Sequence, residues 1–464
     1  MKPHLSLLTL CLLLGACGST AQRPDSGIQP PSSWQSPHTQ NATHRNLQWW
    51  TQFGSPELDR LIEQARVGSY DLAAAIARVR QAQADTVIAG GSLLPEVKAG
   101  LNANRQKLLR GSGYSQLDAD SSNKAVDYFD ANLSATYEID FWGGQRASRD
   151  SAQFGLQASE FDRATVELTL LSGVANSYAQ ALSLREQSRI AELNLANAQN
   201  VLNLVQTRFD SGSATALELA QQKSLVAAQQ RQLPLVQQQA QDALISLAAL
   251  LGRPVQQLRL GAERFEQLSW PTIAAGVPSE LLTRRPDIAR AEAQLAAAQA
   301  DVTVARAAML PAVTLSAELG SGADRAADIL RNPFYNLTAG LLAPVFNNGR
   351  LSAERDKATA RQEELLENYR GAIINGFADV EKALNSIRGL DEQRQWQGEE
   401  LNQAQTAFNI AQSRYEAGAE DLLTVLETQR TLYAAQDLNV QLRLSRLQAS
   451  IALYKALGGG WQAL

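Results

Sequence analysis

Two stretches of this chain are too long and too free of proline to be helices of an ordinary globular domain. Residues 147–210 and 351–416 each contain more than sixty residues without a single proline. Because an α-helix rises 1.5 Å per residue, a helix of that length extends roughly 95 Å. A second long helical segment follows each stretch, at 214–251 and 420–457. The sequence therefore predicts a mainly α-helical chain built on very long helices.

The last helical segment has apolar residues on two of its sides. One seam recurs at spacings of four and three residues and contains Val440, Leu444, Leu447, Ile451 and Tyr454. A second seam contains Leu442, Ala449, Leu453 and Ala456. A simple dimeric coiled coil needs only one seam, so two seams predict a helix with a neighbour on each side, as in a sheet of helices or a closed tube.

The chain is a duplication of one unit, visible as identical fragments at fixed offsets. The fragment AQAD at 82–85 recurs at 298–301, which is 216 residues later, and Leu251-Gly252 recurs as Leu457-Gly458, which is 206 residues later. The first copy therefore carries about ten extra residues, where a variable loop would lie. We assign residues 51–260 to the first repeat and 261–464 to the second. Each repeat reads helix, strand, strand, helix, helix, and the first helix is expected over 56–92.

Four segments of about ten residues alternate apolar and polar side chains, near 96–104, 131–140, 312–319 and 335–343. Such strands occur in half-exposed hairpins of soluble domains. Their length also matches a tilted bilayer crossing, and aromatic residues gather near their ends. We therefore favour a membrane β-barrel. Four strands cannot close a barrel, since the smallest use about eight, so several chains must contribute. Two, three or four chains all remain open from the residues alone.

The first residues form a signal peptide, over 1–16, with Lys2 ahead of an apolar run that is too short for a permanent membrane helix. The ending Leu14-Gly15-Ala16-Cys17 resembles the lipobox of bacterial lipoproteins. The resemblance implies that Cys17 is acylated and becomes the first mature residue, and Gly18 after it implies an outer-membrane destination. Residues 17–50 are then a lipidated, extended N-terminal segment that lies on other structure or acts as a tether.

The composition argues against catalysis. The three histidines, His4, His38 and His44, all lie near the start, and so do the two cysteines, Cys11 and Cys17. The body of the chain therefore has no imidazole base, no thiolate nucleophile and no histidine or cysteine metal site. The formal net charge of −5, without a basic cluster, argues against a nucleic-acid partner. We expect no enzyme activity, no metal and no cofactor apart from the lipid on Cys17.

Several motifs together resemble one known family. They are WWTQF at 49–53, LLTRRPDI at 281–288, and the paired turns RFDSG at 208–212 and RYEAG at 414–418. With the duplicated plan, they resemble the outer membrane factor family, the TolC superfamily, in its lipidated NodT-type branch. The resemblance covers the chain from Cys17 onward. It implies a homotrimer with a 12-stranded outer-membrane barrel and a long periplasmic α-helical tunnel in a Gram-negative bacterium.

The same resemblance implies a function and a set of residues. The tunnel would export small solutes such as drugs or metal ions, after docking with a periplasmic membrane-fusion adaptor and an inner-membrane RND-type transporter. The docking tips would contain Arg208, Gly212, Leu217, Arg414 and Gly418. The periplasmic gate would contain Leu423, Glu427 and Arg430, the arginine acting as a tether.

Plainer interpretations of these residues stay open. The two glycines could serve turn geometry alone, and Glu427 with Arg430 could be an ordinary surface pair. The first copy has Gln221 and Ser224 at the equivalent positions, so one carboxylate per chain would face the pore. For the whole chain, the alternatives are a structural coiled-coil lipoprotein that spaces the outer membrane from the cell wall, or a lipid-anchored enzyme. The membrane-length strands argue against the spacer.

The first testable prediction concerns the anchor. Replacing Cys17 by serine should abolish acylation and weaken membrane attachment, while barrel insertion continues because it does not depend on the acyl chains. Mass spectrometry of the mature N-terminus measures the modification. An unmodified mature chain that begins elsewhere than Cys17 would contradict the prediction.

Overall fold

The computed structural model describes residues 25–36, 48–107, 125–270 and 273–461. Cys17 and the signal peptide lie outside the described residues. The chain divides into two compact units, which are described separately. The first contains Met1–Ile28, Arg80–Ala158 and Ala291–Tyr369, and the second contains Gln29–Val79, Ser159–Arg290 and Arg370–Leu464.

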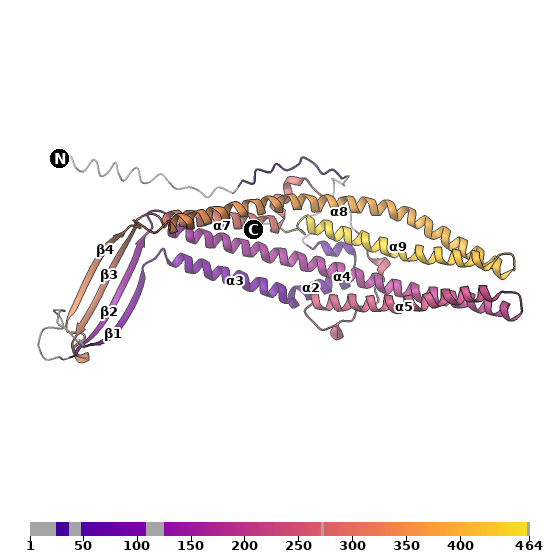
Figure 1. Cartoon of the computed structure of the whole chain (residues 1–464), viewed down its shortest axis with the longest axis horizontal. Coiled ribbons are helices and arrows are strands. Elements are labelled where there is room, and N and C mark those ends of the chain that lie inside the picture. Colours follow the sequence, from indigo (N-terminus) through magenta and orange to yellow (C-terminus); the bar gives the residue numbers. More distant parts are fainter. Residues whose placement is uncertain (1–24, 37–47, 108–124, 271–272, 462–464) are drawn as a thin grey trace. The chain divides into compact units, whose positions relative to one another are not determined.

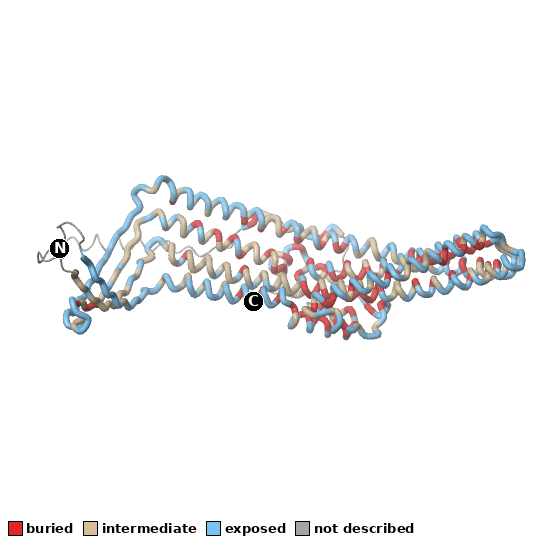
Figure 2. The backbone as a smooth tube through the Cα atoms, turned by 60° about the horizontal axis from the view of Figure 1, so that its bottom comes forward, coloured by how far each residue is buried: buried red, intermediate tan, exposed pale blue. Residues whose placement is uncertain are grey.

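The first unit contains one antiparallel sheet in the order β1-β2-β3-β4. Its strands are β1 (Glu96–Gln106), β2 (Val126–Ile139), β3 (Ala312–Ala323) and β4 (Pro333–Leu342) (Figure 1). Each copy contributes one hairpin, and β2 joins β3 with Leu133 opposite Leu319. Figure 2 shows the strands almost entirely exposed or intermediate. Within the described chain, β1 and β4 each have a single neighbour, so the sheet has two free edges.

β2 and β3 extend beyond the alternating pattern that predicted them. β2 begins at Val126 rather than near 131, and β3 continues to Ala323 rather than ending near 319. The extension runs through Gly320 and Gly322, whose missing side chains leave room for the rings of Phe334 and Tyr128 respectively. Because glycine has no side chain, it interrupts the alternation of apolar and polar residues in β3. The strand predicted from that alternation therefore ended early, although the backbone pairing continues.

Long helices make up most of the rest. α3 (Tyr70–Gly91), α4 (Gly144–Asp210), α7 (Pro286–Ala307) and α8 (Arg350–Glu416) contribute residues to both units. α2 (Pro56–Gly68), α5 (Ala216–Leu250) and α9 (Leu422–Ala456) belong to the second unit. α4 and α8 have 67 residues each, as the proline-free stretches predicted. Among the described helices, none combines the length and apolar character needed to cross a bilayer.

The single helix expected over 56–92 is two helices. α2 ends at Gly68, and Ser69 adopts an extended conformation before α3 begins at Tyr70. The second copy breaks at the equivalent place, where Arg285 is extended between the short α6 (Leu281–Arg284) and α7. Both breaks adjoin a turn that follows a long helix: Gly252 packs against the Gly68 carbonyl, and Gly458 packs against the Arg284 carbonyl. Tertiary contact therefore sets the break, although the apolar spacing continues across it.

The main core of the second unit confirms one predicted seam of α9. Val440, Leu444, Leu447 and Ile451 are buried in a cluster with side chains of α2, α4, α5 and the 3-10 helix η1 (Trp49–Phe53). Trp49 is completely buried there, and its ring stacks on Tyr454 with centroids 5.1 Å apart. The WWTQF motif therefore supplies aromatic side chains that fill the core.

The second seam of α9 faces another neighbour. Leu453 and Ala456 are buried with Val380, Ala383 and Leu384 of α8. Trp34, which is 5% exposed, joins this cluster and donates from Nε1 to the Gly276 carbonyl at 2.9 Å. The two seams thus have two different neighbours, as predicted. Within the N-terminal segment, the described residues 29–36 belong to the second unit, where Trp34 is buried.

The close approach of Gly252 to the α2–α3 break yields a second prediction. An alanine Cβ at Gly252 would overlap the Gly68 carbonyl oxygen, at a residue whose φ is +67°. The Gly252→Ala variant should lose about 1–3 kcal/mol of stability from the backbone conformation alone, and more from the overlap.

A matched control is Gly398→Ala on α8, where a new Cβ meets nothing within 4 Å. Alanine in a helix interior should stabilise this variant by about 0.5–1 kcal/mol. Thermal unfolding of the purified protein at one fixed scan rate compares the two. Equal midpoints for both variants would show that the glycine contact does not matter.

Candidate functional site

The predicted tip residues lie at two helix reversals of the second unit. We call residues 211–215 the first tip turn and residues 417–421 the second tip turn. The first connects α4 to α5 and the second connects α8 to α9, so the two turns are equivalent in the repeat. Their residues decide what surface the helix ends present.

The first tip turn is closed by a left-handed glycine and a capping box. Gly212 has a φ of +76°, and the amide of Ser213 donates to the Arg208 carbonyl at 2.7 Å. Thr215 caps α5 by accepting from the Glu218 amide, while the Glu218 carboxylate accepts from the Thr215 amide. A glycine that ends a helix and a capping box that starts the next are the usual means of reversing a chain sharply.

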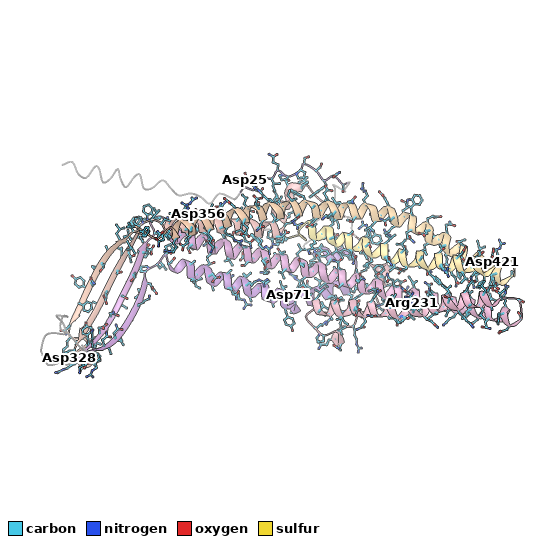
Figure 3. All side chains as sticks on the ribbon, viewed as in Figure 1. Asp25, Asp71, Arg231, Asp328, Asp356 and Asp421 are labelled. Carbon is cyan, nitrogen blue, oxygen red and sulfur yellow. The ribbon has the colours of Figure 1, made fainter. Side chains whose placement is uncertain are left out.

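The second tip turn uses the same glycine with a different cap. Gly418 has a φ of +77°, and the Ala419 amide donates to the Arg414 carbonyl at 2.8 Å. Asp421, the last residue of this turn (Figure 3), accepts from the Thr424 amide at 2.9 Å. That hydrogen bond, with a second from the Thr424 hydroxyl, holds the pKa of the Asp421 carboxyl below its ordinary value. The negative charge of an aspartate at this position is also stabilised by the positive N-terminal end of the α9 dipole.

Arg208 links the two tips inside the chain. Its guanidinium carbon lies 4.2 Å from the centre of the Tyr415 ring, and Nη2 donates to the Tyr415 carbonyl at 2.5 Å and to the Glu416 carbonyl at 3.3 Å. The last carbonyls of α8 carry partial negative charge, which a cation there stabilises. Arg208 was predicted as a docking residue, but its guanidinium is already engaged by the second copy.

Tyr415 is the tip residue that sequence reasoning missed. The side chain is 2% exposed, and burial raises the pKa of its phenol. Among the described residues its hydroxyl has no hydrogen-bond partner. The signal was present in the repeat, because Tyr415 and Phe209 are aromatic residues at equivalent places beside equivalent glycines.

The other predicted tip residues face outward. Arg414 makes contacts only at the limit of hydrogen-bonding distance and on its own turn, at 3.4 Å to a Glu420 carboxylate oxygen and 3.4 Å to the Ala419 carbonyl. Leu217 and Leu423, equivalent in the repeat, are 66% and 54% exposed. Two large apolar side chains and one weakly held cation are therefore available to a partner beside the tip turns.

The three predicted gate residues share one exposed face of α9. Leu423, Glu427 and Arg430 are spaced by four and three residues, which places them on one side of a helix, and all three are exposed. Glu427 and Arg430 form no ion pair with each other in the described part of the chain. The role of Arg430 as a tether stays a prediction.

The side of α9 that packs against α4 is held by buried polar side chains as well as apolar ones. The Gln429 amide donates to the Tyr433 hydroxyl at 3.2 Å, and that hydroxyl donates to the Asn194 carbonyl of α4 at 3.0 Å. Burial raises the pKa of Tyr433 to about 12, so it remains a donor at neutral pH. These contacts fix the rotation of α9 and so determine that Leu423, Glu427 and Arg430 face away from α4. No group of three His, Cys, Asp or Glu residues in the described ranges could hold a metal ion.

Comparison with known proteins divides the chain into the same two copies. The profile of the family described as "Outer membrane efflux protein" matches residues 61–253 and 277–459, one match for each copy. The pyoverdine export outer membrane protein OpmQ of Pseudomonas aeruginosa is 66% identical, over 99% of this chain and 97% of its own length. OpmQ of Pseudomonas putida is 63% identical, over 99% of this chain and 98% of its own.

Solved structures agree in fold. The outer-membrane channel OprN superposes with a TM-score of 0.87 at 26% identity, over 96% of this chain and all of that one. The structure of CusC gives a TM-score of 0.81 at 27% identity, over 94% of this chain and 99% of that one. The fold class of this chain, mainly helical with a small antiparallel sheet, is that of these channels. The chain therefore belongs to the outer membrane efflux protein family, as a transport duct of the Gram-negative outer membrane and not as an enzyme.

Proposed function

We propose that this chain is the outer-membrane duct of an export system whose cargo is pyoverdine. The observation that carries the proposal is identity of 66% and 63% to two pyoverdine export proteins along nearly the whole chain. Relatives named for other cargo are far more distant: the toluene efflux protein TtgF is 30% identical, and the cation efflux protein CusC of Escherichia coli is 28% identical. The sequence alone predicted export of small solutes such as drugs or metal ions, and the proposal narrows the cargo to pyoverdine.

The working assembly in this proposal is a homotrimer. The free edges of β1 and β4 support it, because each exposes unpaired backbone groups that another subunit could pair. Three chains would supply 12 strands in a closed barrel. Large apolar side chains exposed on α5 and α8 also support contact with other subunits. They are Leu235, Ile245, Trp396 and Ile410.

The proposed trimer receives its cargo from a periplasmic adaptor and an inner-membrane transporter. Leu217 and Arg414 would contact the adaptor, and Gly212 and Gly418 would shape the turns that present them. Arg208 would act indirectly, because its guanidinium already holds the end of α8. That the transporter is of RND type, and that Cys17 carries a lipid, both stay predictions.

The gate in this proposal is a ring of Leu423 and Glu427 from each subunit. Its support is their shared exposed face on α9, distinct from the side on which Gln429 and Tyr433 pack. Carboxylates crowded around one axis would repel one another and favour cations over anions. Pyoverdine would pass only when the tips move apart.

A complementation experiment tests the cargo. Expressed in Pseudomonas aeruginosa that lacks its own OpmQ, this chain should restore pyoverdine in the medium and lower pyoverdine in the periplasm, because the two proteins share most of their residues. Mass spectrometry of both fractions measures the change.

CusC of Escherichia coli, with the same fold class and 28% identity, is the matched control and should not restore export. If this chain assembles in the outer membrane while pyoverdine stays in the periplasm, the proposed cargo is wrong.

A double variant tests the gate. Replacing Leu423 and Glu427 together by alanine should raise single-channel conductance, reduce cation selectivity and admit large antibiotics, because both the apolar and the acidic ring are lost. Trimer yield should not change, since both side chains are exposed.

The equivalent change in the first copy, Leu217→Ala with Gln221→Ala, is the control. It removes similar bulk from α5 and no carboxylate, so conductance and selectivity should stay as in the unmodified channel. Equal effects of the two double variants would show that no gate lies at Leu423 and Glu427.

A further inference from the structure

A groove between α8 and α9 in the second unit carries two lysines that the chain itself does not use. Its volume is about 590 Å³, and Lys382 of α8 and Lys455 of α9 both line it. Both lysines are exposed, and neither ammonium group forms an ion pair or a hydrogen bond with any residue that the structure describes. Ser386, Ser445 and Gln448 add hydroxyl and amide groups to the lining. The groove is therefore cationic and polar.

The one carboxylate among the described lining residues is already engaged. Asp379 pairs with Arg285 at 3.0 Å. Arg285 also pairs with Asp287 at 2.7 Å and donates to the Ala456 carbonyl at 3.2 Å, so its guanidinium is fixed from several sides. The charges of the two lysines are therefore left without a counterion in the described chain.

The fold does not require these charges, because the first copy builds the same helix pair without them. Four lining positions differ between the copies, at an offset of 206 residues: Asn176 against Lys382, Ala249 against Lys455, Gly173 against Asp379, and Leu250 against Ala456. In the first copy Leu250 fills the space beside Gly173, where an added Cβ would lie 3.5 Å from the leucine side chain. The cationic groove is therefore a feature of the second copy.

The α9 wall of the groove continues the face that carries the proposed gate. An α-helix turns about 100° per residue, so Ser445, Gln448 and Lys455 lie within about 40° of Leu423 around the helix axis. The distance along the axis from Glu427 to Lys455 is about 42 Å. The groove and the gate therefore face the same space at two different heights.

The other side of α9 is covered by the segment that connects the two copies. We call residues 255–270 the strap. Arg443 of α9 donates to the carbonyls of Glu266 and Leu268 in the strap, at 2.6 and 2.8 Å. Arg443 lies about 160° from Leu423 around the helix axis. Because the strap covers the side opposite the gate and the groove, it lies outside the proposed tube, and the groove faces the lumen.

We propose that this groove binds the carboxylate groups of a negatively charged cargo during its passage through the duct. The inference rests on the proposed function and adds one chemical property, negative charge, to its cargo. Ammonium groups beside hydroxyl and amide donors suit an oxyanion. A volume of about 590 Å³ lies within the range of pockets that hold drug-sized ligands. In a trimer, two lysines from each subunit would give six around one lumen.

The acidic ring and the lysines would act on such a cargo in sequence. They are about 42 Å apart, several times the distance over which physiological salt screens charge, so each acts alone. An anionic solute that has passed Glu427 would be repelled by the ring behind it and attracted by Lys382 and Lys455 ahead. Exposed lysines bind weakly, which a duct needs, because its cargo must also leave.

Block of single-channel current by citrate tests the groove. Citrate is a tricarboxylate, and it is added to assembled channels in a planar bilayer from the side of the β-strands, so that the gate does not separate it from the groove. It should reduce the current through the unmodified channel. The Lys382→Gln/Lys455→Gln variant should need a roughly tenfold higher concentration for half block, because two exposed ion pairs per subunit are lost. Its reversal potential in a KCl gradient should shift toward cation selectivity.

Two further variants separate a local charge effect from a general one. Lys382→Arg/Lys455→Arg keeps both cations and should be blocked like the unmodified channel. Arg259→Gln/Arg264→Gln removes the same charge from two exposed residues of the strap and should also leave the block unchanged. Unchanged block in Lys382→Gln/Lys455→Gln, or equal loss of block in the strap variant, would overturn the proposal.

Pyoverdine export by the same variants keeps the two proposals apart. If the unmodified chain exports pyoverdine while citrate block ignores Lys382 and Lys455, the groove is wrong and the proposed duct stands. If citrate block follows the two lysines while the unmodified chain exports no pyoverdine, the groove is an anion site and the proposed cargo is wrong.

Discussion

The packing of α9 between two neighbours is the constraint on which the rest of the second unit depends. Leu447 and Ile451, both almost fully buried, pack against α4 and its surroundings, and Leu453 packs against α8. Burying each such side chain contributes about 1.5–3 kcal/mol, whereas a hydrogen bond such as that from Tyr433 to Asn194 adds a net of only about 0.5–1.5 kcal/mol. Apolar burial therefore holds the helices together, and the polar contacts decide their rotation. Since α5 packs on α4 through Gln222, the helices follow the order α8, α9, α4, α5, with free faces at both ends.

Free faces at both ends make the single chain incomplete in the same way in each unit. The sheet of the first unit has unpaired edges at β1 and β4 among the described residues, and in the second unit α5 and α8 expose large apolar side chains such as Leu235 and Trp396. Exposed strand edges favour uncontrolled association unless another strand pairs with them. Assembly of several chains into a ring would explain both observations. In such a ring, the two copies within one chain would contact each other much as the second copy of one chain contacts the first copy of the next.

Much of this arrangement could be predicted from the sequence, because it depends on local periodicity. The proline-free stretches gave α4 and α8, the two seams gave both neighbours of α9, and Gly212 and Gly418 gave the tip turns. The rest depends on contacts between residues far apart in the chain. The break at Ser69 is set by packing against the turn at Gly252, and the extra length of β3 is set by rings that fill the space beside Gly320 and Gly322. The role of Arg208 was missed because its partner Tyr415 lies more than two hundred residues away. The pairing of Arg430 with Glu427 was suggested by helical spacing alone, which brings side chains near one another without requiring them to bond.

Comparison of the two copies also distinguishes residues that set the backbone, which are alike in both, from residues that make the two copies different. Positions that reverse or break the backbone are alike in the two copies, as Gly212 is to Gly418 and Gly252 is to Gly458. Several positions near the tips differ between the copies: Gln221 against Glu427, Ser224 against Arg430, and the half-exposed Phe209 against the buried Tyr415. In a ring whose copies alternate, identical residues would make every boundary equivalent, and no boundary could open before another. At these two positions only the second copy carries charge, on Glu427 and Arg430, which is why the proposed acidic ring belongs to α9 alone. Tyr415 is 2% exposed and Phe209 is 38% exposed, so the aromatic position beside the turn is covered in the second copy and accessible in the first. The likeness of the copies therefore sets where the helices turn, and their differences determine which side chains each tip presents.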